Sequence, residues 1–329
     1  MSTAPSVQSL SSSVTQWISE HLKPIHDVHH IEGFSDVYLV THGTPSQKCV
    51  LRVRSCEETE RITCELRLLA YLRDHGVRVE CGVPSPQEAL TTIQADQPHL
   101  LVRYTFSEGQ GRLNAHLRTD PHYRLMLSES EGFGFTLGSF HRVADEWVKS
   151  NSVSERRGFS LEHIQEKFPM AKQCLAPIVD EVLLGECEQK FWSCWHDLQA
   201  LKLRDIPSEF GLCHRDCHME NTLFDKEGNA TLIDWETCGF GFRTYDMGHY
   251  VLAFKHASKD DLNAFLRGYE NGAQRKLHDA EALAMGKMAA MREMWGIACI
   301  SLRSAKKPLD VQIKQKDYFE ERLKYFLNV

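Results

Sequence analysis

The sequence predicts an α+β protein of two lobes, a small β-rich N-terminal lobe with one helix and a larger, mostly helical C-terminal lobe. Three observations indicate this. Strand-like stretches are concentrated between residues 29 and 54 and between 88 and 104, and a single amphipathic helical pattern at 57–75 separates them. After Phe106 the apolar spacing is mainly helical. A short β-rich island at 210–236 is the one clear interruption, so strands should be concentrated in the first third of the chain.

A loose tail is expected to end in the serine-rich run at residues 9–13, and a helix is expected to start there, because Val14, Trp17, Ile18 and Leu22 fall near helical spacing. Strands are predicted at 29–33, 37–41 and 48–54, which are rich in β-branched and aromatic residues. Turn-forming residues separate them, namely Gly33 and the stretch 43–46. This spacing is typical of consecutive strands joined by short turns.

A helix is predicted next, over 57–75, because its leucines and isoleucine recur on one face and Gly76 follows as a stop signal. Two further strands are predicted at 88–94 and 99–104. The polar residues 95–98 between them favour a hairpin.

The remainder of the chain reads as helices, at 133–144, over an interrupted stretch at 161–201, and from 245 to the end. We therefore assign residues 1–105 to the N-terminal lobe and 106–329 to the C-terminal lobe. The hinge is expected close to this boundary.

The composition excludes several classes of function. Lys and Arg total 38 against 45 Asp and Glu, a formal net charge of −7, which argues against a general nucleic-acid binder because phosphate contacts need a basic face. No stretch approaches the roughly 18 consecutive apolar residues of a membrane span, and the first 13 residues lack the basic start and apolar core of a secretory signal. The 11 cysteines, an odd number with no C-x-x-C pair, are typical of a reduced, cytoplasmic protein.

The segment 212–236 carries the chemistry. Asp216 precedes Asn221 by five residues in a loop between two short predicted strands, and Asp234 ends the next strand. Phosphoryl transfer from ATP uses such a set. One carboxylate lies beside the attacking hydroxyl, while an amide oxygen and a second carboxylate hold Mg²⁺, a cation that prefers oxygen ligands.

These residues resemble a known family. His214–Asp216 followed by Asn221 matches the kinase catalytic-loop pattern H-R-D-x-x-x-x-N. The additional His218, and Ile-Asp234-Trp in place of D-F-G, look like the aminoglycoside phosphotransferase family. This family of protein-kinase-like fold also includes choline kinase, homoserine kinase of the second type and a bacterial stress-response protein kinase. The resemblance implies that Asp246 ties the catalytic loop to the helix that follows.

The resemblance implies roles for individual residues. Asp216 would orient or deprotonate the acceptor hydroxyl, and we group His214 and His218 with it as catalytic-loop residues, His218 as a support for the loop. Asn221 and Asp234 would bind Mg²⁺. The implied cofactors are ATP and Mg²⁺.

The N-terminal lobe would cover the nucleotide phosphates and supply a cation. The loop 33–38 would face the phosphates through Ser35 and its backbone N–H groups, with a plain hairpin turn as the alternative, since it has only one glycine. Arg52 is the predicted cation, because a guanidinium can bind phosphate oxygens with two parallel hydrogen bonds. Arg54 lies on the same strand face and is the rival, and a solvated strand face is the alternative for both.

Two further nucleotide contacts are implied by the resemblance. Glu65 matches the helix glutamate that pairs with this cation, with an exposed charge as the alternative. The adenine would lie against Val50, Leu101 and Val102, and its edge would bond to backbone groups from Arg103 to Thr105.

The acceptor pocket is expected between the catalytic loop and the C-terminal helices. Apolar residues surround the helical pattern at 282–303, so Arg292 and Glu293 should be buried and need a partner or a ligand. Glu293 with Trp295 would suit an ammonium group, and an internal ion pair is the alternative for Glu293. Glu236 is a second candidate for an amine-bearing acceptor, with an exposed glutamate as its alternative.

We therefore expect an enzyme that transfers the γ-phosphoryl group of ATP to a hydroxyl of a small, amine-bearing molecule, an amino alcohol, hydroxy amino acid or aminosugar. The short stretch between Asp234 and the next predicted helix leaves little room for a peptide-docking loop. A Ser/Thr protein kinase of the stress-response type is the first alternative. A nucleotide-binding pseudokinase is the second, although the intact Asp216, Asn221 and Asp234 argue against it.

Overall fold

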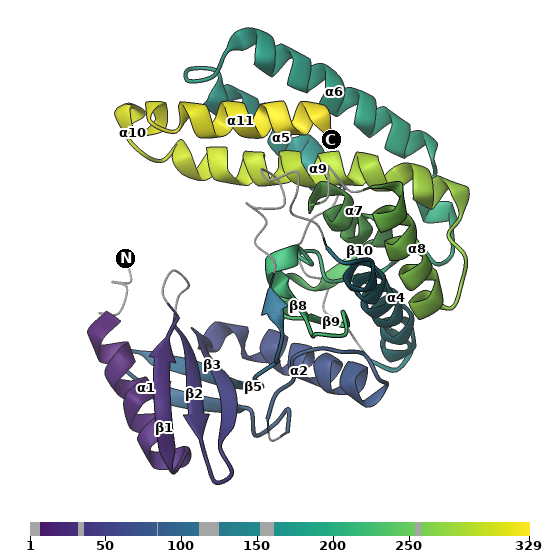
Figure 1. Cartoon of the computed structure of the whole chain (residues 1–329). Coiled ribbons are helices and arrows are strands. Elements are labelled where there is room, and N and C mark those ends of the chain that lie inside the picture. The colour runs from purple at the N-terminus through teal and green to yellow at the C-terminus, as the bar shows by residue number, and fades with distance from the viewer. Residues whose placement is uncertain (1–6, 32–35, 84, 112–124, 152–160, 254–257) are drawn as a thin grey trace.

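The computed structural model describes residues 7–31, 36–83, 85–111, 125–151, 161–253 and 258–329, and it has a β-rich end and a helical end (Figure 1). The β-rich end is a five-stranded antiparallel sheet of order β1-β2-β3-β5-β4. Its strands are β1 (Ile25–His30), β2 (Val37–His42), β3 (Gln47–Ser55), β4 (Leu90–Gln94) and β5 (Pro98–Thr105). The α+β class predicted from the sequence, with a β-rich part followed by a mostly helical part, is confirmed.

The two faces of this sheet pack against different helices. Helix α1 (Val7–His21) covers one face, where its apolar residues meet alternate residues of β3 and β5 such as Leu51 and Leu101. Helix α2 (Thr59–Asp74) belongs to the core on the opposite side, together with Val102. Because successive side chains of a strand point to opposite faces, Arg52, which pairs across the sheet with Val102, lies on the α2 side.

The helical end is built from eight helices within the described residues (Figure 1). They are α4 (Leu127–Ser150), α5 (Leu161–Leu175), α6 (Glu181–Ala200), α7 (Arg243–Ala253), α8 (Lys259–Ala273), α9 (Asp279–Ser304), α10 (Leu309–Ile313) and α11 (Lys316–Asn328). Helices α5, α6, α9 and α11 enclose a second apolar core. None of the described helices combines the length and the apolar character needed to cross a membrane.

Two small sheets lie between these ends and carry the candidate site. β7 (Phe210–Cys213) pairs antiparallel with β10 (Gly239–Phe242), and β8 (Thr222–Phe224) lies between β6 (Gln110–Gly111) and β9 (Ala230–Leu232). The largest core joins α2 and α4 to these strands, with Trp235 and Phe140 in edge-to-face contact inside it. The β-rich and helical ends therefore share a continuous core.

Most predicted elements are present. The differences concern the limits of α1 and β1 and the two strands β6 and β10, which were not predicted. β1 begins at Ile25 and ends at His30, whereas the sequence favoured 29–33. All six of its residues are exposed, so no apolar alternation marks its limits. β10 was not predicted, because its Gly-Phe-Gly-Phe sequence lacks β-branched residues.

Candidate active site

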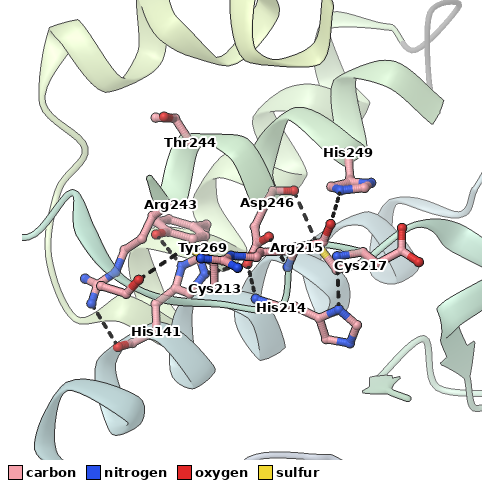
Figure 2. A network of polar contacts seen from close by, with 12 residues as sticks. His141, Cys213, His214, Arg215, Cys217, Arg243, Thr244, Asp246, His249 and Tyr269 are labelled. Atoms are coloured by element: carbon pink, nitrogen blue, oxygen red, sulfur yellow. Dashed lines mark hydrogen bonds and ion pairs between the residues drawn. The ribbon is translucent and has the colours of Figure 1, made fainter. Parts of the chain in front are cut away.

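The catalytic loop between β7 and β8 is held in place by Asp246, a fully buried residue in the first turn of α7 (Figure 2). Its Oδ2 accepts a hydrogen bond from the His214 N–H at 2.7 Å, and its Oδ1 accepts one from the Arg215 N–H at 2.8 Å. Burial alone would raise the pKa of this carboxyl, but hydrogen bonds from His141 and from backbone hold the pKa below its usual range. Asp246 is therefore a charged anchor for the loop, as the resemblance implied.

A second layer orients Asp246. His141 Nε2 lies 3.1 Å from Asp246 Oδ2, and His141 Nδ1 lies 2.8 Å from the Tyr269 hydroxyl. The carboxylate can only accept, so Nε2 carries the proton and Nδ1 accepts from Tyr269. Burial lowers the pKa of His141, which keeps the ring in this neutral form. The chain Tyr269–His141–Asp246 thus connects α8, α4 and α7 to the catalytic loop.

The thiols around Asp246 could suggest a metal site, since His141, Cys213 and Asp246 lie close enough to share an ion. The same holds for Cys217, Asp246 and His249. However, both oxygens of Asp246 already accept hydrogen bonds, and burial raises the pKa of both thiols well above the usual value. Protonated thiols are poor metal ligands, so the cluster fits a scaffold rather than a metal centre.

The predicted catalytic base and metal ligands lie together. Asn221 Nδ2 donates to the Asp216 carbonyl at 2.9 Å and lies 3.4 Å from Asp216 Oδ2. Because the amide nitrogen donates inward, the amide oxygen is the atom available to a metal. The Ile233 N–H donates to the Asn221 carbonyl at 3.0 Å, which brings the neighbouring Asp234 to the same edge. About a third of each aspartate side chain is exposed.

His214 has a positioning role, which corrects its grouping with the catalytic residues. The ring is fully buried beside Trp235, with 4.5 Å between ring centroids. The Asp216 N–H lies 3.3 Å from Nδ1, so Nε2 carries the proton and donates to the Ile233 carbonyl at 3.1 Å. A ring with both nitrogens occupied by the backbone holds the loop and does not reach a reacting atom.

His218 also fits a supporting role. Its Nδ1 accepts from the Glu220 N–H at 3.2 Å, and its Nε2 lies 3.6 Å from Asp216 Oδ2. Burial lowers the pKa of His218, although the negative charge of Asp216 opposes the shift. These contacts lie within the loop, so the His218 ring supports the conformation of the loop beside Asp216.

Arg52 reaches the predicted metal aspartate. Its Nη1 lies 2.7 Å from Asp234 Oδ1, and its Nη2 lies 3.5 Å from Glu80 Oε2. Glu80 Oε1 also accepts from the Asp234 N–H at 2.6 Å. Burial acts to lower the pKa of Arg52, but Glu80 and Asp234 raise the pKa above its usual value. The rival, Arg54, pairs with Glu236 at 3.0 Å instead.

The expected partner of this cation is corrected from Glu65 to Glu80. Glu65 Oε1 accepts from the Tyr104 hydroxyl at 3.0 Å, and its Oε2 lies 3.9 Å from Arg61 Nη1. The carboxylates in contact with Arg52 in the described part of the chain are those of Glu80 and Asp234. Sequence reasoning missed Glu80, although a single acid within the apolar stretch 77–83 is the signal that could have found it.

One adenine contact expected on β5, that of Leu101, is corrected, and two of the expected backbone donors are already used. The Arg103 N–H donates to the Ala89 carbonyl at 2.8 Å, and the Thr105 N–H donates to the Cys81 carbonyl at 2.7 Å. Both donors are therefore already used. Leu101 faces α1, away from Arg52. Ser35, the predicted phosphate contact, lies outside the described residues.

The residues predicted to bind an ammonium group already have internal partners. Glu293 is fully buried and forms an ion pair with Arg322 of α11, so the internal ion pair is the alternative that the structure favours. Lys167 of α5 lies over the Trp295 ring, 4.1 Å from its centroid. Glu236, bonded to Arg54, links the catalytic segment to β3.

Arg292, which the sequence singled out without a role, contacts the catalytic loop directly. Its Nη2 lies 3.2 Å from Asp216 Oδ1. The burial of α9 suggested only that this charge needs a partner. No local spacing relates residue 292 to residue 216, so the pairing depends on the tertiary fold.

Comparison with known proteins identifies the family. Residues 29–283 match the model of the phosphotransferase enzyme family, and the chain belongs to it. An uncharacterized protein of Deinococcus radiodurans is 24% identical over an alignment of 284 residues that covers 83% of this chain and 76% of the relative. The expected family and the expectation of a phosphotransferase are thereby confirmed.

Solved structures show the same fold. A microcompartment-associated aminopropanol kinase superposes with a TM-score of 0.66 at 20% identity, covering 96% of this chain and 94% of the other. An aminoglycoside phosphotransferase from Alicyclobacillus acidocaldarius superposes with a TM-score of 0.63 at 17% identity, covering 99% of this chain and 96% of the other. At these identities the likeness concerns the fold.

Proposed function

We propose that this protein transfers the γ-phosphoryl group of ATP, with Mg²⁺, to a hydroxyl of a small molecule. One set of contacts carries the proposal: Asn221 contacts Asp216, the Ile233 N–H next to Asp234 donates to the Asn221 carbonyl, and Arg52 contacts Asp234 at 2.7 Å. An amide oxygen and a carboxylate oxygen fit the preference of Mg²⁺ for oxygen ligands. Family membership supports the reaction class.

Each residue has a separate task in this proposal. Asp216 accepts a hydrogen bond from the acceptor hydroxyl and takes its proton as the acceptor oxygen bonds to the γ-phosphorus and the bond from that phosphorus to the bridging oxygen of the leaving ADP breaks. Asn221 and Asp234 are the residues that would hold Mg²⁺, which supplies charge neutralisation at the phosphate oxygens. Arg52 adds a fixed cation on the nucleotide side. Most of the rate then comes from positioning and electrostatics.

The acceptor proposed here is an amino alcohol, a hydroxy amino acid or an aminosugar. β10 begins at Gly239 and α7 at Arg243, so only a short segment follows Asp234. Such a segment offers little surface for docking a peptide, which favours a small molecule over a protein substrate.

The test is ADP release from Mg·ATP with a panel of small hydroxyl acceptors and a generic protein substrate. Asp216→Asn should lower acceptor-dependent turnover by about 10²–10⁴-fold, the usual contribution of a general base. Asp310→Asn makes the same chemical change at an exposed site on α10 and should match the wild type. Full activity in Asp216→Asn would reject the assigned base, and labelling of protein alone would indicate a protein kinase.

A further inference from the structure

We propose that the acceptor is a short hydroxy acid and that Arg292, with Arg322 beside it, binds its carboxylate. This inference rests on the proposed phosphotransferase function and narrows the acceptor. Of the three classes named above, it selects hydroxy amino acids over amino alcohols and aminosugars. The evidence comes from the face of α9 that lies next to Asp216.

Arg292 has hydrogen-bonding capacity that the described residues do not use. Its guanidinium carries five N–H donors and stays protonated. One of them reaches Asp216 Oδ1 at 3.2 Å, whereas Nε is buried and has no hydrogen-bond partner among the described residues. Less than a fifth of the side chain is exposed. Because Nε is out of contact with solvent, a ligand would meet the Nη1 donors, which make no hydrogen bond among the described residues and lie beside Gly296.

A second guanidinium flanks the same spot. A β-carbon placed on Gly296, one turn after Arg292, would lie 3.2 Å from Arg292 Nη1 and 3.2 Å from Arg322 Nη2. The two nitrogens are therefore no further apart than twice that distance, and the bare helix surface of Gly296 lies between them. A carboxylate matches this arrangement, because its two oxygens can each accept from a guanidinium.

The charges around this spot favour an anion over an ammonium group. The two features that suit an ammonium group are occupied by cations of the chain, Glu293 by Arg322 and the Trp295 ring by Lys167. Among the described residues, Arg292 and Arg322 contact the carboxylates of Asp216 and Glu293, and Lys167 lies over the neighbouring Trp295 ring. These cations favour a ligand carboxylate over an ammonium group at this position.

The contact between Arg292 and Asp216 also limits the length of the acceptor. The guanidinium of Arg292 that would bind the acceptor carboxylate also contacts Asp216. The two carboxylates therefore lie close to each other, and Asp216 must also contact the acceptor hydroxyl. The hydroxyl and the carboxylate of the acceptor are therefore separated by only a few bonds. Serine, threonine and homoserine have this form, whereas an aminosugar has no carboxylate.

The experiment compares acceptors that differ in the carboxylate alone. The pairs are L-serine with ethanolamine, L-threonine with 1-amino-2-propanol, L-homoserine with 3-amino-1-propanol, and glycerate with ethylene glycol. Binding is measured by calorimetry in the presence of Mg·ADP, and turnover is measured with Mg·ATP. At least one carboxylate member should bind about 10- to 100-fold more tightly than its partner, as expected for charge-assisted hydrogen bonds.

The variant Arg292→Gln separates recognition from a structural role. It should raise the KM of the preferred carboxylate acceptor and remove the preference within its pair. A structural role would lower kcat/KM for both members equally and leave their ratio unchanged. Arg303→Gln is the matched control, because Arg303 is an exposed arginine further along α9, and it should behave as the wild type.

The possible outcomes distinguish this inference from the proposed function. Carboxylate-dependent binding that Arg292→Gln removes, without turnover of any acceptor, would support the binding site and reject the transfer reaction. Turnover that favours the members without a carboxylate would support the transfer reaction and overturn the inference. The absence of binding by every carboxylate member would also overturn it, whatever the turnover.

Discussion

Asp246 shows how one carboxylate can fix a catalytic loop without touching a substrate. It accepts hydrogen bonds from the backbone of His214 and Arg215 and has no exposed surface. These two residues directly precede Asp216, so the position of the catalytic carboxylate follows from that of Asp246. Asparagine has nearly the same shape but carries no charge and only one acceptor oxygen, which makes it a direct test.

We predict that Asp246→Asn lowers kcat by at least about tenfold and the free energy of unfolding by about 3 kcal/mol, because it disrupts a buried, charge-assisted network. His141→Gln is the graded comparison, since a glutamine amide can still donate to Asp246, and its effect should be smaller. Urea unfolding and steady-state kinetics measure both. Equal stability and turnover in Asp246→Asn and the wild type would contradict the anchoring role.

At the scale of residues, the sequence could predict the local part of the site and little else. Asp216 and Asn221 are five residues apart in one loop, so their proximity is a property of the sequence itself. The partners Glu80 and Arg292 come from distant segments, and only the folded chain brings them to Asp234 and Asp216. Glu65 was predicted as the partner of the cation because it lies on the expected helix, yet Glu80 lies closer.

The pairing of α4 with α8 depends on close approach of their backbones. A β-carbon on Gly138 of α4 would lie 2.3 Å from the Tyr269 carbonyl oxygen, and one on Gly272 of α8 would lie 2.1 Å from the Phe135 carbonyl oxygen. No side chain fits there without moving a helix. This close contact sets the distance between His141 and Tyr269, which together orient Asp246.

We predict that Gly138→Ala lowers the free energy of unfolding by about 2 kcal/mol or more, because the added methyl group forces two helix backbones apart. Turnover should fall as well, since Tyr269 moves with α8. Gly286→Ala is the matched control on α9, where nothing lies within 4 Å of the added β-carbon. It should stabilise by about 0.5–1 kcal/mol, the usual difference between alanine and glycine in a helix. The free energy of unfolding of both variants, measured in urea, tests this prediction. A Gly138→Ala variant that is more stable than the wild type would contradict this packing.

At the scale of elements, periodicity predicted the long helices and the central strands. Periodicity could not predict which helices touch. When each segment is considered by itself, the glycines that allow α4 and α8 to meet only lower the helix propensity. β10 is the clearest omission. β10 forms a strand because it pairs with β7, although its Gly-Phe-Gly-Phe sequence has no β-branched residue.

At the scale of the whole molecule, two ion pairs connect the five-stranded sheet to the catalytic segment. Arg52 and Arg54, on one face of β3, contact Asp234 and Glu236 respectively. The Glu236 carbonyl also accepts a hydrogen bond from Arg61 Nη1 at 3.0 Å, which adds α2 to the connection. The proposed metal site therefore lies where the β-rich and helical ends meet, and a ligand bound there stabilises both.

This arrangement predicts that Mg²⁺ binds together with nucleotide and not alone. The guanidinium of Arg52 lies 2.7 Å from Asp234 Oδ1, so a divalent cation placed there meets a like charge in a partly buried setting, where repulsion is stronger than in water. Nucleotide phosphates supply the negative charge that removes this repulsion. Millimolar Mg²⁺ alone should leave Tm unchanged, while Mg·ADP at about 100 times its Kd should add about 2.7 kcal/mol of stability and raise Tm by several degrees. Asp234→Asn should remove the dependence of this shift on Mg²⁺, with Asp310→Asn as the control. A Tm shift of the same size with Mg²⁺ alone would contradict the role given to Arg52.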